Sequence, residues 1–187
     1  MKSIQNIIER INVRYEELGE SFNINQLRSI IRDQETPIED IEIPDVPGEM
    51  YPYSRKIITS TEIVEITVLR WNINGQSMIH DYGESYGIVR VLSGHLNFTL
   101  FNSELNEIGQ GSVPAIDTFD LPGKLIHKMY NPSNYQETIS LHFYCPKLNG
   151  INIYLPDENR KIALKGGIGA WYPQTSDIIS EGKLHSS

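Results

Sequence analysis

A series of short β-type segments occupies most of the chain after Tyr53, and it constrains the fold more than any other feature of the sequence. The segments are rich in β-branched and aromatic residues, and clusters of Gly, Pro, Asn and Ser separate them. They cover residues 56–58, 63–71, 77–80, 88–92, 96–101, 124–129, 138–144 and 151–155. No helical period interrupts them, and such spacing is typical of an antiparallel barrel or sandwich. The sequence therefore predicts a mainly β protein.

The residues before this series predict helices and a connector. Ile4, Ile7, Ile8 and Ile11 follow the spacing of an amphipathic helix, and a second helical segment ends before Pro37. Prolines and acidic residues then fill 36–52, which excludes a regular helix or a central strand there. We expect one domain over 1–187, with helices in 1–35, a connector in 36–52, a β-barrel in 53–175 and a loosely ordered tail in 176–187.

Charge and cysteine content exclude several classes of function. A formal net charge of -8 argues against nucleic acid or an anionic membrane as the main partner. The single cysteine, Cys145, excludes an internal disulfide and a metal site built from cysteines alone. No run approaches the roughly 20 apolar residues of a membrane span, and the first residues lack the apolar core of a signal peptide. We therefore expect a cytoplasmic protein.

A His-x-Tyr pair is the strongest indication of chemistry in the sequence. Successive side chains of an extended strand alternate between its faces, so His80 and Tyr82 point the same way while Asp81 points the other way. His127 and His142 also lie in predicted strands among apolar neighbours. A lone strand histidine is usually structural, but three of them with a tyrosine beside one favour a metal site.

The spacing of these residues resembles the two sequence motifs of the cupin superfamily. The first motif is matched by Gly75, His80-x-Tyr82, Gly87 and Gly94, with Tyr where a second histidine normally stands. Residues 122–131 resemble the second motif, in which His127 is followed by Asn131. The resemblance implies an antiparallel cupin β-barrel, or jelly roll, which here follows N-terminal α-helices.

Within the cupins the chain is similar to the cysteine dioxygenase group of thiol dioxygenases. The likeness extends over roughly residues 50–146 and is carried by 53–55, 79–96, 125–129 and 140–146 in the expected order. It implies a ferrous iron held by three histidine nitrogens, a small thiol as substrate and O2 as co-substrate. Fe2+ is the expected metal, with Ni2+ or another divalent ion as the alternative.

The resemblance also assigns the metal and substrate contacts. By position, His80 and His127 would be metal ligands, and Tyr82 takes the place of the third ligand. Arg55 would pair with the substrate carboxylate, a role suited to a planar guanidinium, and Tyr53 would lie beside it in the substrate site.

The remaining site residues come from the segment 138–144. Tyr144 matches a tyrosine that lies near the substrate and oxygen, and Ser140 and His142 match the hydrogen-bonded residues that orient it. Gly87 matches a position that in some members holds a cysteine crosslinked to that tyrosine, so the crosslink cannot form here.

Tyr82 departs from the three histidine ligands that the resemblance implies, and the chemistry of the site depends on it. Tyrosine ligates a metal as phenolate, and its ordinary pKa is about 10, so a metal must displace its proton. A phenolate would favour a more oxidised iron than three neutral imidazoles do. Either Tyr82 ligates, or its position is open, or the metal site is lost.

The leading functional hypothesis is a metal-dependent, O2-using oxygenase of L-cysteine or a close analogue. Oxidation to the sulfinic acid is the simplest outcome, and the altered ligand makes oxidative rearrangement or decarboxylation in a biosynthetic pathway a second one. The alternative is a non-catalytic cupin that binds a small anionic ligand. The oligomeric state does not follow from the sequence.

Overall fold

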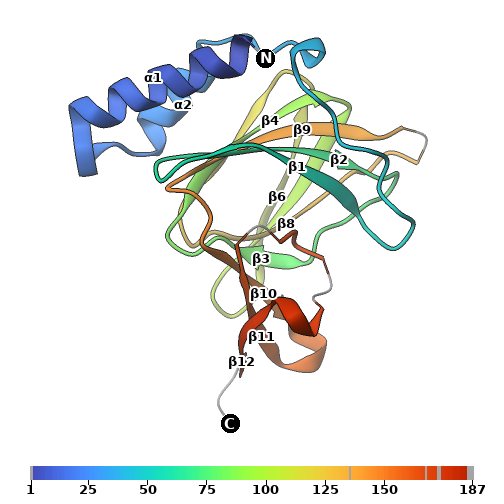
Figure 1. Ribbon diagram of the computed structural model, residues 1–187. Coiled ribbons are helices and arrows are strands. Elements are labelled where there is room, and N and C mark those ends of the chain that lie inside the picture. Colours follow the sequence, from blue (N-terminus) through green and yellow to red (C-terminus); the bar gives the residue numbers. More distant parts are fainter. Residues whose placement is uncertain (1, 135, 167, 172–173, 185–187) are drawn as a thin grey trace.

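The computed structural model describes residues 2–134, 136–166, 168–171 and 174–184. Over these residues the chain forms two antiparallel sheets (Figure 1). The five-stranded sheet has the order β1 (Tyr53–Ser60), β2 (Glu65–Trp71), β9 (Thr138–Cys145), β4 (Tyr86–Ser93) and β7 (Thr118–Leu121). The seven-stranded sheet has the order β12 (Ile178–Lys183), β11 (Arg160–Lys165), β10 (Gly150–Leu155), β3 (Ile79–Asp81), β8 (Ile126–Tyr130), β5 (His95–Phe101) and β6 (Glu107–Pro114).

Side chains of the two sheets meet in a shared core. Leu69, Trp71 and Val89 from the five-stranded sheet pack in one buried cluster with Leu96 and Met129 from the seven-stranded sheet. Two sheets joined by such a core form the predicted antiparallel barrel. The mainly β fold class is therefore confirmed.

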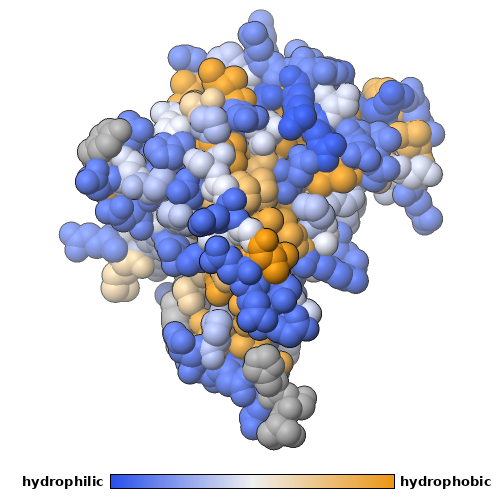
Figure 2. All heavy atoms as spheres, turned by 180° about the vertical axis from the view of Figure 1, so that it is seen from behind, coloured by the Kyte–Doolittle hydropathy of each residue, from blue (hydrophilic) through white to orange (hydrophobic). Residues whose placement is uncertain are grey.

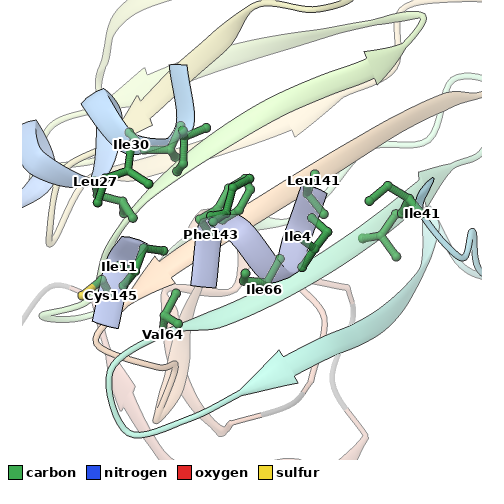
Figure 3. Close-up of a cluster of buried hydrophobic side chains, with 14 of the residues drawn as sticks. Ile4, Ile11, Leu27, Ile30, Ile41, Val64, Ile66, Leu141, Phe143 and Cys145 are labelled. Atoms are coloured by element: carbon green, nitrogen blue, oxygen red, sulfur yellow. The ribbon is translucent and has the colours of Figure 1, made fainter. Parts of the chain in front are cut away.

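The N-terminal helices cover the outer face of the five-stranded sheet. Helix α1 (Lys2–Leu18) buries Ile4, Ile7 and Ile11, and helix α2 (Ile24–Arg32) buries Leu27, Ile30 and Ile31. These side chains pack against the outward residues Ile66 and Phe143 of the sheet (Figure 3). The expected helices of the N-terminal region are present, and their apolar stripes explain why they lie on the barrel.

Short 3-10 helices complete the described elements. Their bounds are Gly19–Ser21, Ile38–Asp40, Pro156–Glu158 and Thr175–Asp177. Apart from the second of these, no helix or strand is found in the expected connector, whose residues 36–52 are all described.

Strand β9 determines which residues line the barrel interior. All eight residues of β9 are buried, and they alternate between the two faces. Leu141, Phe143 and Cys145 belong to the cluster under the helices. Ser140, His142 and Tyr144 therefore point into the barrel.

Four strands lie outside the predicted segments, namely β6, β7, β11 and β12. Three of them, β6, β7 and β12, are edge strands, which have a partner on one side only. An edge strand has little need of continuous apolar residues, so its sequence resembles a loop. The prediction of a loosely ordered tail is wrong for residues 178–183, because they form β12 and pair with β11. Of the other two histidines, His95 begins β5 and His185 lies outside the described residues.

The surface seen in Figure 2 is predominantly hydrophilic, with hydrophobic side chains gathered along the middle of the face. Among the described residues, no helix has both the length and the apolar character needed to cross a bilayer.

Candidate metal centre

Two buried histidines face each other across neighbouring strands. His80 of β3 is paired directly with His127 of β8, and their ring centroids are 4.3 Å apart. Directly opposed residues share one face of a sheet, so both rings point into the barrel. The exposed fractions of the two residues are 2% and 0%. The structure therefore brings together two imidazoles from separate sequence motifs.

The backbone fixes the tautomer of each ring in the same way. Nδ1 of His80 lies 2.8 Å from the carbonyl oxygen of Met78, and Nδ1 of His127 lies 2.9 Å from that of Leu125. A carbonyl oxygen only accepts, so each Nδ1 carries the proton and each Nε2 presents a lone pair. Metal-ligating histidines are commonly oriented through such a bond from the other ring nitrogen.

His127 Nε2 is buried and has no hydrogen-bond partner among the described residues. A buried acceptor without a partner costs free energy, and such an atom calls for a ligand or another physical explanation. Burial lowers the pKa of His127 to about 4, and it lowers the pKa of His80 well below its ordinary value, with the neighbouring His127 adding to the effect. Both rings are therefore neutral at pH 7, which is the form that binds a metal.

Tyr82 brings an oxygen to the same place. Its hydroxyl lies 2.8 Å from His80 Nε2, and its ring centroid is 5.4 Å from that of His127. Burial and the adjacent Tyr144 raise the pKa of Tyr82 well above its ordinary value, so the side chain is a neutral phenol in the metal-free protein. Its proton points at a nitrogen that a metal would occupy.

A continuous chain of hydrogen bonds leads away from Tyr82 into the barrel wall. Tyr144 Oη lies 3.2 Å from Tyr82 Oη, His142 Nδ1 lies 3.0 Å from Tyr144 Oη, and Ser140 Oγ lies 2.8 Å from His142 Nε2. Trp71 Nε1 closes the far end by donating to Ser140 Oγ at 2.9 Å.

The two ends of this chain fix the direction of every hydrogen bond in it. His80 Nε2 can only accept, so Tyr82 donates to it and must itself accept from Tyr144. Tyr144 then accepts from Nδ1 of His142, whose Nε2 accepts from Ser140. His142 is neutral, because burial and the charge of Arg55 lower its pKa to about 3. The sequence predicted that Ser140, His142 and Tyr144 lie together, and the structure adds the link to Tyr82.

Gly87 makes room for the Tyr144 ring. The two residues are paired between β4 and β9, and a Cβ at position 87 would lie 2.4 Å from the carbonyl oxygen of Phe143 and 3.1 Å from Tyr144 Cδ1. The position beside the tyrosine therefore requires glycine.

Arg55 enters the same interior from β1, but it already has a charged partner. Its Nη2 donates to Glu65 Oε1 at 3.1 Å and to Thr67 Oγ1 at 3.4 Å, and Thr67 donates to the same carboxylate oxygen at 3.3 Å. Glu65 is paired directly with Tyr144 across β2 and β9, and it is 3% exposed.

Sequence reasoning missed Glu65. Its signal was available: Glu65, Thr67 and Leu69 alternate with the apolar residues that face the helices, so a carboxylate at position 65 falls on the inner face of β2.

Tyr53 lies on the same face of β1 as Arg55. Its hydroxyl accepts a hydrogen bond from the backbone N–H of Ala170. The centroid of its ring lies 4.5 Å from that of Trp71 and 5.3 Å from that of Trp171. The ring is buried in the cluster that the two sheets share, and its role toward a substrate stays a prediction.

The donor atoms present fit a metal ion only if Tyr82 or a non-protein ligand takes part. No group of three or more His, Cys, Asp or Glu residues suited to a metal exists within the described ranges. His80 Nε2, His127 Nε2 and the Tyr82 oxygen are the available protein donors, and imidazole and phenolate both suit iron.

Comparison with known proteins gives a family match. The model of the family described as cysteine dioxygenase type I matches residues 48–157. The chain is 21% identical over 154 residues to cysteine dioxygenase type 1 of Danio rerio, covering 78% of this chain and 75% of that protein. It is 23% identical over 141 residues to cysteine dioxygenase type 1 of Bos taurus, covering 68% of each chain.

Solved structures match the barrel. A Klebsiella pneumoniae conserved protein with a double-stranded β-helix domain superposes with a TM-score of 0.50 at 14% identity, covering 59% of this chain and 90% of that chain. An oxalate oxidase superposes with a TM-score of 0.51 at 18% identity, covering 62% of this chain and 60% of that chain. At these identities the likeness shows the fold alone, and it confirms the antiparallel β-barrel that the sequence predicted.

Proposed function

Because the chain belongs to the cysteine dioxygenase type I family, we propose that it is a metal-dependent thiol oxygenase that uses O2 and acts on L-cysteine or a close analogue. The observation that carries the proposal is the buried, unpartnered Nε2 of His127 beside the Nε2 of His80. A barrel built only for packing has no use for an acceptor in this state.

The ion would be held by His80 Nε2, His127 Nε2 and the Tyr82 oxygen, with Fe2+ as the first candidate and Ni2+ or another divalent ion as the alternative. Once bound, such an ion supplies the redox chemistry that lets O2 react with a thiol sulfur. Occupation of His80 Nε2 would remove the acceptor of the Tyr82 proton. Tyr144 would still donate to the Tyr82 oxygen, which supports a phenolate there.

The hydrogen-bond chain would position the reacting groups. His142 holds the Tyr144 hydroxyl so that its proton points toward the centre, and Ser140 holds His142 in the required tautomer. A donor fixed in this way in a dry interior needs little reorganisation when charge develops on nearby oxygen or sulfur.

The simplest reaction converts a thiol and O2 into the sulfinic acid, with both oxygen atoms transferred to sulfur. Tyr82 adds a negative charge where three neutral imidazoles would have none, so an oxidation that ends in rearrangement or decarboxylation is the variant that we propose to test beside it.

The experiment combines metal analysis with product detection. The purified protein is loaded with Fe2+ or Ni2+, its metal content is measured, and it is incubated with cysteine under air before mass spectrometry of the products. We expect stoichiometric metal and consumption of the thiol. His127→Gln should lose both, whereas His95→Gln, a histidine of β5 outside the centre, should keep both. Metal occupancy below a few per cent would refute the proposal.

A second candidate is a cupin that binds a small anionic ligand without turnover. The observation that favours it is the hydrogen bond that the Tyr82 hydroxyl donates to His80 Nε2, which takes up the lone pair that a metal would need. Thermal shift with cysteine and cysteine sulfinate, with and without metal, separates the two candidates, since binding without consumption indicates the second.

A further inference from the structure

An ion pair inside the barrel changes what the site can recognise. Arg55 and Glu65 contact each other at 3.1 Å, and their side chains are 11% and 4% exposed. Glu65 is paired directly with Tyr144 across β2 and β9, and Thr67, which contacts both Arg55 and Glu65, is paired with His142. The pair therefore lies in the substrate region.

Glu65 cancels the charge that would attract a carboxylate. An unpaired guanidinium in a dry site favours an anion, but one that already holds a carboxylate leaves the pair with no net charge. A substrate carboxylate at Arg55 would stand next to Glu65, and two like charges in a buried site repel. Moving Glu65 aside would leave its own charge buried and unpaired.

The pair still offers directional hydrogen bonds. Both hydrogen bonds of Arg55 leave from Nη2, and its Nη1 and Nε have no hydrogen-bond partner within the described part of the chain. Glu65 uses Oε1 for its contacts with Arg55 and Thr67. The free edge of Arg55 can donate to a neutral carbonyl oxygen, and Glu65 Oε2 can accept from an amine or an ammonium group.

We infer that Glu65 is a specificity-determining residue, and that the thiol taken by this site carries an amine but no free carboxylate at the Arg55–Glu65 pair. Amino thiols and cysteine whose carboxyl group is masked as an amide or ester have this chemistry. The inference rests on the proposed function and narrows its substrate from L-cysteine to the close analogues without a free carboxylate, with L-cysteine itself as a weaker substrate.

The test uses four small thiols and the full-length protein loaded with Fe2+. Cysteamine has an amine only, L-cysteinamide an amine and a neutral carbonyl, L-cysteine an amine and a carboxylate, and 3-mercaptopropionate a carboxylate only. Binding is measured by calorimetry without oxygen, and kcat/KM by oxygen consumption. We expect cysteamine and L-cysteinamide to bind at least about tenfold more tightly than the two carboxylates.

The variant Glu65→Gln removes the charge and keeps the shape. It should shift the ratio of affinities for 3-mercaptopropionate and cysteamine by at least about tenfold toward the carboxylate. The matched control is Glu137→Gln, which removes the charge from the more exposed pair that Glu137 forms with Arg70 at 2.7 Å. The control should leave the ranking of the four thiols unchanged.

The outcomes are separable. If the wild type binds L-cysteine or 3-mercaptopropionate more tightly than cysteamine and L-cysteinamide, the role of Glu65 is wrong, but the proposed thiol oxygenase activity is unaffected. This comparison uses the wild type alone, so it remains decisive even if Glu65→Gln does not fold. An unchanged ranking in a folded Glu65→Gln would also overturn it. If no thiol is oxidised, the proposed function fails while the binding ranking still decides the inference, and absence of binding by all four overturns both.

Discussion

Tyr82 lies where two imidazoles and a chain of hydroxyl groups meet. Its oxygen contacts His80 Nε2 at 2.8 Å and accepts from Tyr144. If Tyr82 binds the metal as phenolate, ferric protein should show a visible absorption band that Tyr82→Phe lacks. Tyr144→Phe is the control and should keep the band. A band that survives in Tyr82→Phe would show that Tyr82 does not ligate.

Tyr144→Phe removes the hydroxyl that links His142 to Tyr82. The ring remains in its packed position, so we expect stability to change little. Loss of an oriented donor at a reaction centre should lower kcat by about 100-fold or more. Steady-state kinetics together with thermal unfolding check this. If Tyr144→Phe has the same kcat as the wild type, the Tyr144 hydroxyl has no role in the reaction and the residue contributes only to packing.

His142 makes the stability of the metal-free protein depend on pH. Burial lowers its pKa from 6.5 to about 3, so between these pH values the unfolded chain binds a proton that the native protein does not. Stability is therefore full above pH 6.5 and falls as the pH falls. From this residue we expect a loss of about 2 kcal/mol between pH 7 and pH 5. Urea unfolding at both pH values should show that the free energy of unfolding changes less with pH in His142→Gln than in the wild type. An equal change in the two proteins would contradict the role of His142.

At the scale of elements, helix α2 stabilises the fold from outside the candidate centre. Asn23 Oδ1 accepts from the Asn25 N–H at 2.9 Å, and Gln26 Oε1 accepts from the Asn23 N–H at 3.2 Å, which together form a capping box. Asn23→Ala should lower the free energy of unfolding by about 1 kcal/mol without changing kcat. Gln5→Ala, on the surface of α1, is the control and should cost less than about 0.5 kcal/mol. Denaturant unfolding measures both, and an equal cost for the two variants would contradict the role of the cap.

At the scale of the whole molecule, the single domain over 1–187 stays a prediction. The helices and the barrel share one buried cluster, in which Ile4 and Leu27 meet Ile66, Leu141 and Phe143 (Figure 3). Removal of residues 1–34 should expose this outer face of the sheet and cause aggregation. Size-exclusion chromatography and thermal unfolding test it. A truncated barrel that elutes normally and unfolds at an unchanged temperature would show a separate unit.

Local sequence was sufficient to predict the residues that share a face. Alternation along a strand has a period of two, so it placed His80 with Tyr82 without knowledge of the fold. The resemblance to the cysteine dioxygenases, and not alternation, grouped Ser140 with His142 and Tyr144. The apolar spacing of residues 4–11 likewise predicted α1. The edge strands β6, β7 and β12 were not predicted, because a strand with one partner needs no continuous apolar pattern.

The pairing of Arg55 with Glu65, on the neighbouring strands β1 and β2, was decided by the folded structure. Which strands are neighbours, and in which register, depends on how the whole chain buries its apolar faces. That arrangement set His127 opposite His80, and it set Glu65 against Arg55, the residue that the resemblance assigns to the substrate carboxylate. The sequence by itself determined a cupin with a His-x-Tyr pair. Only the fold determined that its arginine is already neutralised, because that contact depends on the register of β1 and β2, which shifts at an irregularity between Ile57 and Thr59.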